Sequence, residues 1–230
     1  MNAIKNKTKR RRINRVIRTT RKNFVSKLKS LYPSCKHDSN NDRSSYSGHS
    51  ITYGEMNYDG MKVLYTYVQT INPEINTFID IGSGRGKLCL YLASLPKIKK
   101  CIGIELVKSR CEDAIELKSR LSSAFADKVE FICGDIFSID LSERIMNGFG
   151  TDSYSDSGTD AKVFVWFSNL CFNQETVDDI FEKIVHELPK GSILCCSKKT
   201  TSENPRITFI ETVPIEMSWN KESNVHIYQI

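Results

Sequence analysis

A short glycine-rich segment holds the residues with the clearest chemical potential in this 230-residue sequence. Its residues are Asp80-Ile81-Gly82-Ser83-Gly84-Arg85-Gly86. Glycines at this spacing allow a sharp turn and a close approach of the backbone to a ligand, and a helix that follows presents free N–H groups. A carboxylate before the first glycine repels a pyrophosphate but attracts a cation. Asp80 therefore favours the sulfonium and ammonium groups of S-adenosylmethionine over a dinucleotide.

Two further carboxylates follow the next two predicted strands. Glu105 ends the second strand and can accept hydrogen bonds from both hydroxyls of a ribose. Asp135 follows the third strand and can accept from an adenine amino group, with Ile136 or Phe137 covering the ring. Each carboxylate alone is equally consistent with a solvated charge at a strand end. Together with Asp80 they converge where such sheets bind ligands, so we predict an S-adenosylmethionine site at this edge.

A third set of candidate residues follows the fourth predicted strand. The segment is Ser168-Asn169-Leu170-Cys171-Phe172, beside the position of the transferred methyl group in folds of this type. Ser168 and Asn169 offer oxygen acceptors to an incoming amine. The segment is not Asn-Pro-Pro-aromatic, the pattern expected for methylation of base amino groups, and the sequence has no Pro-Cys dipeptide for attack on a pyrimidine ring. Both observations disfavour a nucleic-acid methyltransferase without excluding it.

Positioning these residues requires strands that alternate with helices. Alternation predicts a parallel sheet with helices on both faces, and two final strands in succession add an antiparallel strand. We predict an α/β fold with a seven-stranded, mostly parallel, doubly wound sheet and a C-terminal antiparallel strand, which is the class I methyltransferase layout. The predicted strands are Thr77–Ile81, Cys101–Glu105, Val129–Cys133, Val163–Phe167, Ser192–Cys196, Ile207–Val213 and Val225–Ile230. The predicted helices are Tyr58–Ile71, Leu88–Leu95, Lys108–Phe125 and Glu175–Leu188, and residues 147–161 are predicted to be a surface insertion.

Charge divides the sequence into two parts. Residues 1–50 carry a net charge of +12, whereas the whole chain carries +6, so residues 51–230 carry −6. Apolar residues recur at helical spacing from Ile13 to Leu31, with cations on the other faces, and Pro33 follows. This pattern predicts an amphipathic basic helix. We therefore predict a basic arm with a polar linker over residues 1–50 and a methyltransferase domain over residues 51–230.

Four interpretations of the arm remain open at this point. It can be a solvated tail without a specific partner, or a segment that binds nucleic acid or nucleosomes and also directs nuclear import. It can also be a mitochondrial targeting peptide or attach to an anionic membrane surface. The favoured partner is DNA, and the cations that would contact it are Lys9, Arg10, Arg11, Arg12, Arg15 and Arg18.

The remaining composition excludes several other classes of protein. The eight cysteines form no Cys-x-x-Cys pair, and we expect them to be reduced and mostly buried, as in a reducing compartment. The four histidines are scattered, so we predict no metal site. The sequence has no run of eighteen apolar residues and its first residues lack the apolar stretch of a secretory signal, so we expect no membrane partner.

Taken in order from Thr52 to the C-terminus, these motifs resemble the non-SET histone lysine methyltransferases of the disruptor-of-telomeric-silencing type. The glycine-rich turn is common to many methyltransferases, whereas the first and last motifs are more specific to this family. The motifs that carry the resemblance are Tyr53-Gly54-Glu55, the turn from Asp80 to Gly86, Gly103 with Glu105, Gly134-Asp135, Ser168 to Phe172, Ser197-Lys198, and Ser218-Trp219 with Val225 and Tyr228.

The resemblance implies a protein-lysine methyltransferase that acts on a histone lysine of the nucleosome, in the nucleus rather than in the cytoplasm or mitochondrion. It implies that Tyr53, Gly54 and Glu55 form a loop that closes over the cofactor. It also implies that Trp219, Phe172 and Tyr228 line a narrow channel for the lysine; without the resemblance, Trp219 and Tyr228 would be expected to pack in the core.

Three departures from the family pattern bear on these expectations. Ser168 replaces the first Asn of the family's pair, Leu170 replaces an aromatic residue, and Tyr228 aligns only after a one-residue insertion. Two alternatives therefore remain open: an RNA or DNA methyltransferase on the same fold, and a non-catalytic protein that binds the cofactor or chromatin. The sequence does not predict the oligomeric state.

Overall fold

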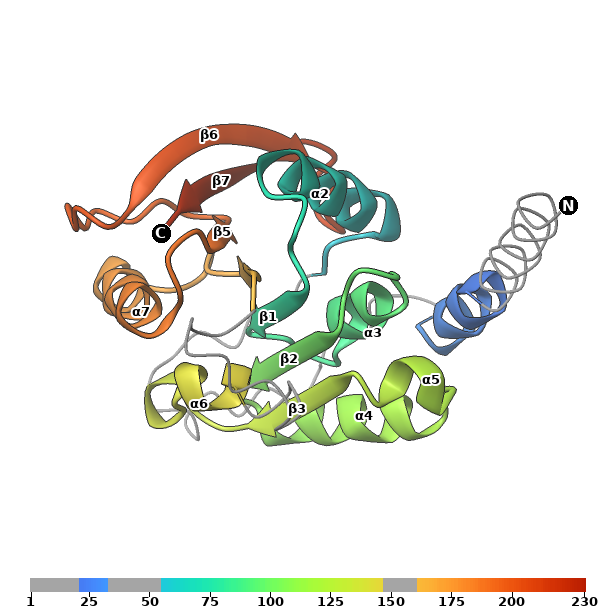
Figure 1. Cartoon of the computed structure of the whole chain (residues 1–230). Helices are drawn as coiled ribbons and strands as arrows, with labels where there is room; N and C mark the ends of the chain where they lie inside the picture. Colours follow the sequence, from blue (N-terminus) through green and yellow to red (C-terminus); the bar gives the residue numbers. More distant parts are fainter. Residues whose placement is uncertain (1–20, 33–54, 147–160) are drawn as a thin grey trace, which may run out of the picture.

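The computed structural model describes residues 21–32, 55–146 and 161–230 and contains a seven-stranded sheet in the order β3-β2-β1-β4-β5-β7-β6 (Figure 1). The first five strands are parallel, and β7 runs antiparallel to both of its neighbours. The predicted doubly wound sheet with an antiparallel C-terminal strand is confirmed. The strands are β1 (Thr77–Ile81), β2 (Lys100–Glu105), β3 (Val129–Cys133), β4 (Val163–Phe167), β5 (Ile193–Cys196), β6 (Thr208–Ile215) and β7 (Ser223–Gln229).

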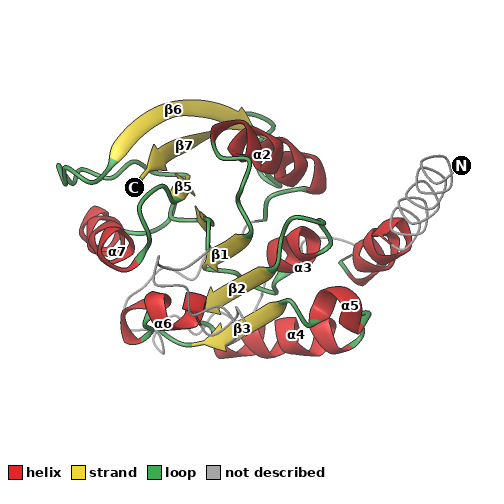
Figure 2. Cartoon of the chain, in the orientation of Figure 1, coloured by secondary structure: helices red, strands yellow, loops and turns green. Residues whose placement is uncertain are grey.

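Helices cover both faces of the sheet, and each face has its own apolar core (Figure 2). One core contains side chains of α2, α3 and α4, and the other contains side chains of α6 and α7. In the described part of the chain, no helix combines the length and apolar character that crossing a membrane requires. The helices are α2 (Tyr58–Ile71), α3 (Lys87–Ala93), α4 (Lys108–Ser119), α5 (Ser123–Ala126), the 3-10 turn η2 (Ile136–Ser138), α6 (Leu141–Met146) and α7 (Gln174–Glu187).

The helix over 58–71 has its predicted bounds, whereas the short helices differ from expectation. The predicted helix over 108–125 is divided into α4 and α5. The helices α6 and η2 were not predicted, because such short segments do not show a helical periodicity. The predicted insertion lies outside the described residues except for Ala161, which is buried.

The central strands explain where a ligand can bind. All five residues of β1 and of β4 are buried, as expected for parallel strands covered on both faces. The chain runs from β1 toward β2 on one side and from β4 toward β5 on the other, so the strand order reverses between β1 and β4. Such a switch point leaves a crevice at the carboxyl ends of the two strands.

Residues 21–32, which the sequence assigned to the basic arm, pack on the domain. A helix covers residues 21–31, and Phe24, Leu28 and Tyr32 belong to the same apolar core as α2 and α3. The Phe24 ring lies 4.6 Å from the ring of Phe125, centroid to centroid. Lys22, Lys27 and Lys29 of this helix are exposed, although Lys27 also donates to the Arg120 carbonyl oxygen and Lys29 lies over the Tyr58 ring. Residues 1–20, with the six cations expected to bind DNA, lie outside the described residues.

One expectation about the cysteines is wrong. Cys111 on α4 and Cys133 at the end of β3 form a disulfide, with their Cα atoms 5.5 Å apart. The two cysteines are 22 residues apart in the sequence, and they come together because α4 packs directly beside β3. Cys89, Cys101, Cys171, Cys195 and Cys196 are free, and all but Cys171 are buried as expected. The remaining cysteine, Cys35, lies outside the described residues.

We expect replacement of Cys133 by Ser to destabilise the folded chain. Opening a loop of 22 residues restores freedom to the unfolded state, which corresponds to about 3 kcal/mol in the free energy of unfolding. Urea unfolding under non-reducing conditions measures this difference. Cys171→Ser is the matched control, because Cys171 is free and exposed and its loss should change stability by less than about 0.5 kcal/mol. Equal stability of the wild type and Cys133→Ser would show that the bond does not form in solution.

Candidate active site

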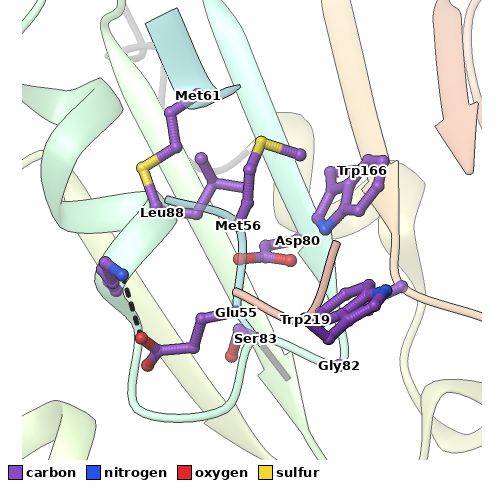
Figure 3. A pocket seen from close by; sticks show the side chains of 11 residues that line it. Glu55, Met56, Met61, Asp80, Gly82, Ser83, Leu88, Trp166 and Trp219 are labelled. Atoms are coloured by element: carbon purple, nitrogen blue, oxygen red, sulfur yellow. Dashed lines mark hydrogen bonds and ion pairs between the residues drawn. The ribbon is translucent and has the colours of Figure 1, made fainter. Parts of the chain in front are cut away.

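A pocket lies at the carboxyl ends of β1 and β4, where the strand order reverses (Figure 3). Its volume is about 410 Å³, counting the part open to solvent. The pocket is lined by Glu55, Met56, Met61, Asp80, Gly82, Ser83, Lys87, Leu88, Trp166, Ser168 and Trp219. Five of the predicted site residues, Glu55, Asp80, Gly82, Ser83 and Ser168, are thus brought together with the predicted channel residue Trp219.

Asp80 is the most perturbed acid of the pocket. Its side chain is 3% exposed, and burial together with repulsion from Glu105 raises its pKa to about 8. Within the described residues its carboxylate forms no ion pair, and its one hydrogen bond comes from the Cys89 thiol at 3.9 Å. A carboxylate in this position is stabilised by a bound cation. The site therefore fits the positively charged part of S-adenosylmethionine.

The glycine-rich turn is shaped to let a ligand approach. Gly82 has a φ of 79°, and a Cβ at this position would meet no atom within 4 Å, so the turn faces open space. Gly86 has a φ of 77°, and a Cβ there would lie 2.2 Å from the Phe131 ring, so only glycine fits. The Ser83 hydroxyl is buried and has no hydrogen-bond partner, which leaves it available to a ligand.

Glu105 fixes the turn through a hydrogen bond to its backbone. Its side chain is 5% exposed, Oε2 accepts a hydrogen bond from Gly84 N at 2.7 Å, and Oε1 accepts from Val107 N at 2.9 Å. The sequence predicted a ligand contact here but did not reveal that Glu105 also fixes the turn.

The predicted adenine region lies at the exposed end of β3. The Asp135 side chain accepts from Phe137 N at 3.0 Å and thereby caps η2. Ile136 is buried in the core with α6 and α7, whereas the Phe137 ring is 47% exposed. Of the two apolar residues considered for covering adenine, Phe137 is therefore the one with a free ring.

The segment that carries Glu55 is joined to the loop that carries Trp219. Glu55 O accepts from Ser218 N at 2.8 Å, Glu55 N donates to the Ser218 hydroxyl at 3.1 Å, and Met56 pairs with Met217. Two motifs that lie 163 residues apart in the sequence therefore meet at the mouth of the pocket. Tyr53 and Gly54, the other residues of the predicted loop, lie outside the described residues.

An ion pair connects this segment to the turn. Lys87 Nζ lies 2.9 Å from Glu55 Oε2, and both side chains are largely buried (Figure 3). The same ammonium lies 4.9 Å from the centroid of the Tyr58 ring. Because Lys87 begins α3 directly after Gly86, the pair ties the Glu55 segment to the helix that follows the turn.

Apolar side chains complete the pocket, and most of them were not predicted. Figure 3 shows the indoles of Trp166 and Trp219 on one side and Met61 and Leu88 on the other, with Asp80 between them. Trp219 is 43% exposed, as a wall residue open to solvent would be. Trp166 could have been found, because it precedes Ser168 by two positions and therefore leaves the strand on the same face.

Asn169 has a different surrounding from Ser168. Its side-chain amide donates to Lys198 O at 2.9 Å and accepts from Lys198 N at 2.7 Å. The residue is fully buried, so its side chain joins the ends of β4 and β5 and does not enter the pocket. Of the two predicted acceptors, Ser168 is the one that the structure places at the pocket.

Phe172 and Tyr228, the other residues expected in a lysine channel, lie on the opposite face of the sheet from the apolar pocket wall. Tyr228 is 4% exposed, with Phe181 and Phe209 in edge contact at centroid distances of 5.3 and 5.4 Å. Tyr228 pairs with Leu194, one residue after β5 begins and away from its carboxyl end. The Phe172 ring packs 5.4 Å from that of Phe167 in the same core. Tyr228 is therefore a member of this core and Phe172 packs against it, while their place in a lysine channel stays a prediction.

Solved structures with the same fold are S-adenosylmethionine-type methyltransferases. An O-methyltransferase from Bacillus cereus, in complex with S-adenosylhomocysteine, matches with a TM-score of 0.51 and 15% identity over 88% of this chain and 89% of that chain. An RNA methyltransferase from Salinibacter ruber, in complex with S-adenosyl-L-homocysteine, matches with a TM-score of 0.50 and 18% identity over 74% of this chain and 91% of that chain. At these identities the likeness shows the fold alone, and it confirms the class I methyltransferase fold.

The relatives found by sequence belong to a narrower class of methyltransferases than the solved structures do. The chain is 28% identical over 156 residues to a histone-lysine N-methyltransferase of Drosophila melanogaster, specific for lysine 79 of histone H3, and the match covers 68% of this chain and 8% of the relative. It is 26% identical over 172 residues to a Caenorhabditis elegans protein of the same description, over 72% of this chain and 17% of the relative. The chain thus spans less than a fifth of the length of these relatives.

The family model described as histone methylation protein DOT1 matches residues 32–226. The match begins at Tyr32, before the predicted domain start, and includes the turn, the carboxylates and the Ser218-Trp219 loop. These are the motifs on which the resemblance in the sequence was based. This chain therefore belongs to the DOT1 family of histone methylation proteins.

Proposed function

We propose that this chain is an S-adenosylmethionine-dependent protein-lysine N-methyltransferase whose acceptor is a histone lysine on the nucleosome. The observation that carries the proposal is the meeting of Asp80, the Glu55 segment and Trp219 around one pocket. Asp80 suits the cationic cofactor, and the Trp219 loop belongs to the motifs that distinguish this family from other methyltransferases. The family match and the two histone-lysine methyltransferase relatives support the same substrate class.

The residues that would hold the cofactor follow from their places in the fold. Asp80 and the backbone of Gly82, Ser83, Gly84 and Gly86 would bind its charged end. Glu105 would accept from the ribose hydroxyls, while Asp135 and Phe137 would bind adenine. Glu55, with Tyr53 and Gly54 before it, would close over the bound molecule. When bound, S-adenosylmethionine supplies the electrophilic methyl group.

The pocket wall suits a lysine side chain. A lysine amine has a pKa near 10.4, so removing its proton at pH 7 costs about 4–5 kcal/mol. Apolar surroundings disfavour the charged form and lower this pKa. Trp166 and Trp219 provide such surroundings, and Ser168 offers one hydroxyl to orient the amine. Burial raises the pKa of Tyr228 to about 12, so this phenol remains protonated and does not serve as a general base at neutral pH.

The basic arm and the family match support the nucleosome as partner and the nucleus as location. Residues 1–50 carry a net charge of +12, and Lys22, Lys27 and Lys29 continue this charge on the exposed side of a helix that is fixed to the domain. Such a surface suits the DNA of the nucleosome. We infer that Lys9, Arg10, Arg11, Arg12, Arg15 and Arg18 bind DNA while the pocket receives the histone, and that the protein acts in the nucleus.

A transfer assay with methyl-labelled S-adenosylmethionine tests the proposed acceptor. Nucleosomes, free core histones, total RNA and DNA are offered in parallel, with Gly84→Arg as the inactive control. We expect label on nucleosomal histone that is lost in the control. Label on nucleic acid alone would mean that the chain does not share the family's acceptor, and cofactor binding without any transfer would indicate a non-catalytic binding protein.

Two variants test which aromatic residue borders the acceptor. Trp219→Ala should lower the transfer rate by about tenfold to a hundredfold, because a misplaced amine meets the methyl group poorly. Tyr228→Phe is the matched control on the other face of the sheet and should retain most of the activity. Loss of activity in Tyr228→Phe with normal activity in Trp219→Ala would reverse the assignment.

Neutralising the basic cluster tests the role of the arm. Replacing Lys9, Arg10, Arg11 and Arg12 by Gln should weaken binding to a labelled DNA duplex and flatten its salt dependence, because each lost phosphate contact lowers the slope by about 0.9. Fluorescence polarisation at several salt concentrations measures both. Lys190→Gln, an exposed lysine after α7, is the single-charge control. Point changes are preferable to deletion, since residues 21–32 belong to the folded core. Unchanged DNA affinity would exclude this role.

A further inference from the structure

Tyr32 contacts the glycine-rich turn through its hydroxyl group and its ring. The residue follows the helix over 21–31, and its side chain is 7% exposed. Its hydroxyl donates a hydrogen bond to the backbone carbonyl oxygen of Arg85, which lies between Gly84 and Gly86 in the turn. The Arg85 guanidinium lies over the Tyr32 ring, 5.7 Å from its centroid. The turn is thus held by a residue 53 positions earlier in the chain.

The turn needs such a contact because its glycines are conformationally free. Gly84 and Gly86 have φ values of 54° and 77°, and an unsupported backbone of this kind samples many other conformations. Glu105 holds Gly84 N from within the sheet, and Ser83 O accepts from Gly86 N at 2.9 Å. The Arg85 carbonyl oxygen lies between these two contacts in the sequence, and Tyr32 is the side chain that donates to it.

Separate contacts keep Tyr32 in place. Arg21 Nε lies 3.4 Å from the Ser94 hydroxyl, and the Phe24 ring packs on Phe125. Farther along, Lys27 donates to the carbonyl oxygen of Arg120. These contacts lie on α3, α4 and α5 and not on the turn. They fix the helix to the domain, while Tyr32 alone of this group contacts the turn.

The Tyr32 hydroxyl acts only as a donor in its hydrogen bond to the Arg85 carbonyl oxygen. Burial is the main reason that the pKa of the Tyr32 hydroxyl lies far above its usual value, so the group remains protonated at any physiological pH. Arg85 is itself held by Asp113 on α4, with Nε 3.1 Å from Oδ2. The ring, the guanidinium and the carboxylate therefore form a short chain of contacts at the turn.

We propose that Tyr32 is a positioning residue for the cofactor: its hydroxyl fixes the Arg85 carbonyl and thereby the conformation of the turn, whose residues Gly82 and Ser83 line the pocket. A site whose backbone is held in advance binds more tightly, because less order is lost on binding. The helix over 21–31 thus has two roles, since it continues the basic arm and completes the cofactor site. Removing residues 1–32 would weaken cofactor binding as well as DNA binding.

Tyr32→Phe in the full chain tests this role, because the variant keeps the ring and removes only the hydroxyl. We expect the dissociation constants of S-adenosylmethionine and S-adenosylhomocysteine, measured by calorimetry, to rise about threefold to tenfold, as the loss of one hydrogen bond allows. Hydrogen exchange of the cofactor-free protein should also show faster exchange in peptides that contain residues 82–87, with other peptides unchanged.

Phe24→Leu is the matched control. It weakens packing of the same helix on Phe125 but does not touch the turn, so it should lower stability and leave both dissociation constants within about twofold of the wild type. Wild-type affinity in Tyr32→Phe with unchanged exchange would overturn the proposal, as would equal weakening in Phe24→Leu. If the wild type itself bound neither ligand, the proposed function would fail, and the exchange measurement would still decide the role of Tyr32.

Discussion

Two buried carboxylates on the neighbouring strands β1 and β2 impose the main physical constraint on this structure. Asp80 is the next-to-last residue of β1 and Glu105 is the last residue of the adjacent parallel strand β2, and both residues are almost fully buried. Glu105 is stabilised by backbone N–H groups, whereas Asp80 has a pKa of about 8 and has no ion pair with the described residues. In the absence of a bound cation, the protonated and neutral form of Asp80 is therefore favoured at neutral pH. A cationic cofactor resolves this electrostatic conflict, and a pyrophosphate would increase it.

The segments around these carboxylates are held by contacts between distant parts of the chain. The Glu55 segment is hydrogen-bonded to Ser218, and Lys87 joins the same segment to the helix after the turn. Tyr32 donates a hydrogen bond to the Arg85 carbonyl oxygen in the turn. These connections give a physical reason why the family match extends from residue 32 to residue 226. Motifs far apart in the sequence form one structural unit at the mouth of the pocket.

Much of this could be predicted from the sequence, because the strands are short apolar runs followed by polar residues. All seven strands were predicted within about two residues of their bounds, and four residues predicted for the site, Asp80, Ser83, Ser168 and Trp219, line one pocket. Trp166, Met56 and Met61 were missed, because an apolar residue that lines a pocket has the same sequence pattern as one in the core. In the structure Ile227 packs in the core that contains Trp166, and its strand neighbour Tyr228 packs in the core of the other face, as alternation along a strand requires.

Contacts between elements were beyond the reach of the sequence. Nothing in the spacing of Cys111 and Cys133 shows that α4 and β3 bring them together, and the helical pattern of residues 21–31 does not tell whether its apolar face is covered.

The central claim is that Asp80 becomes ionised when a cation binds beside it. Calorimetry of S-adenosylmethionine binding at pH 7, in buffers of different ionisation enthalpy, tests this claim most directly. Because Asp80 is mostly protonated in the free protein and ionised beside a cation, we predict release of nearly one proton, with affinity rising as the pH increases from 6 to about 8. Binding without proton release, at an affinity independent of pH, would contradict the account.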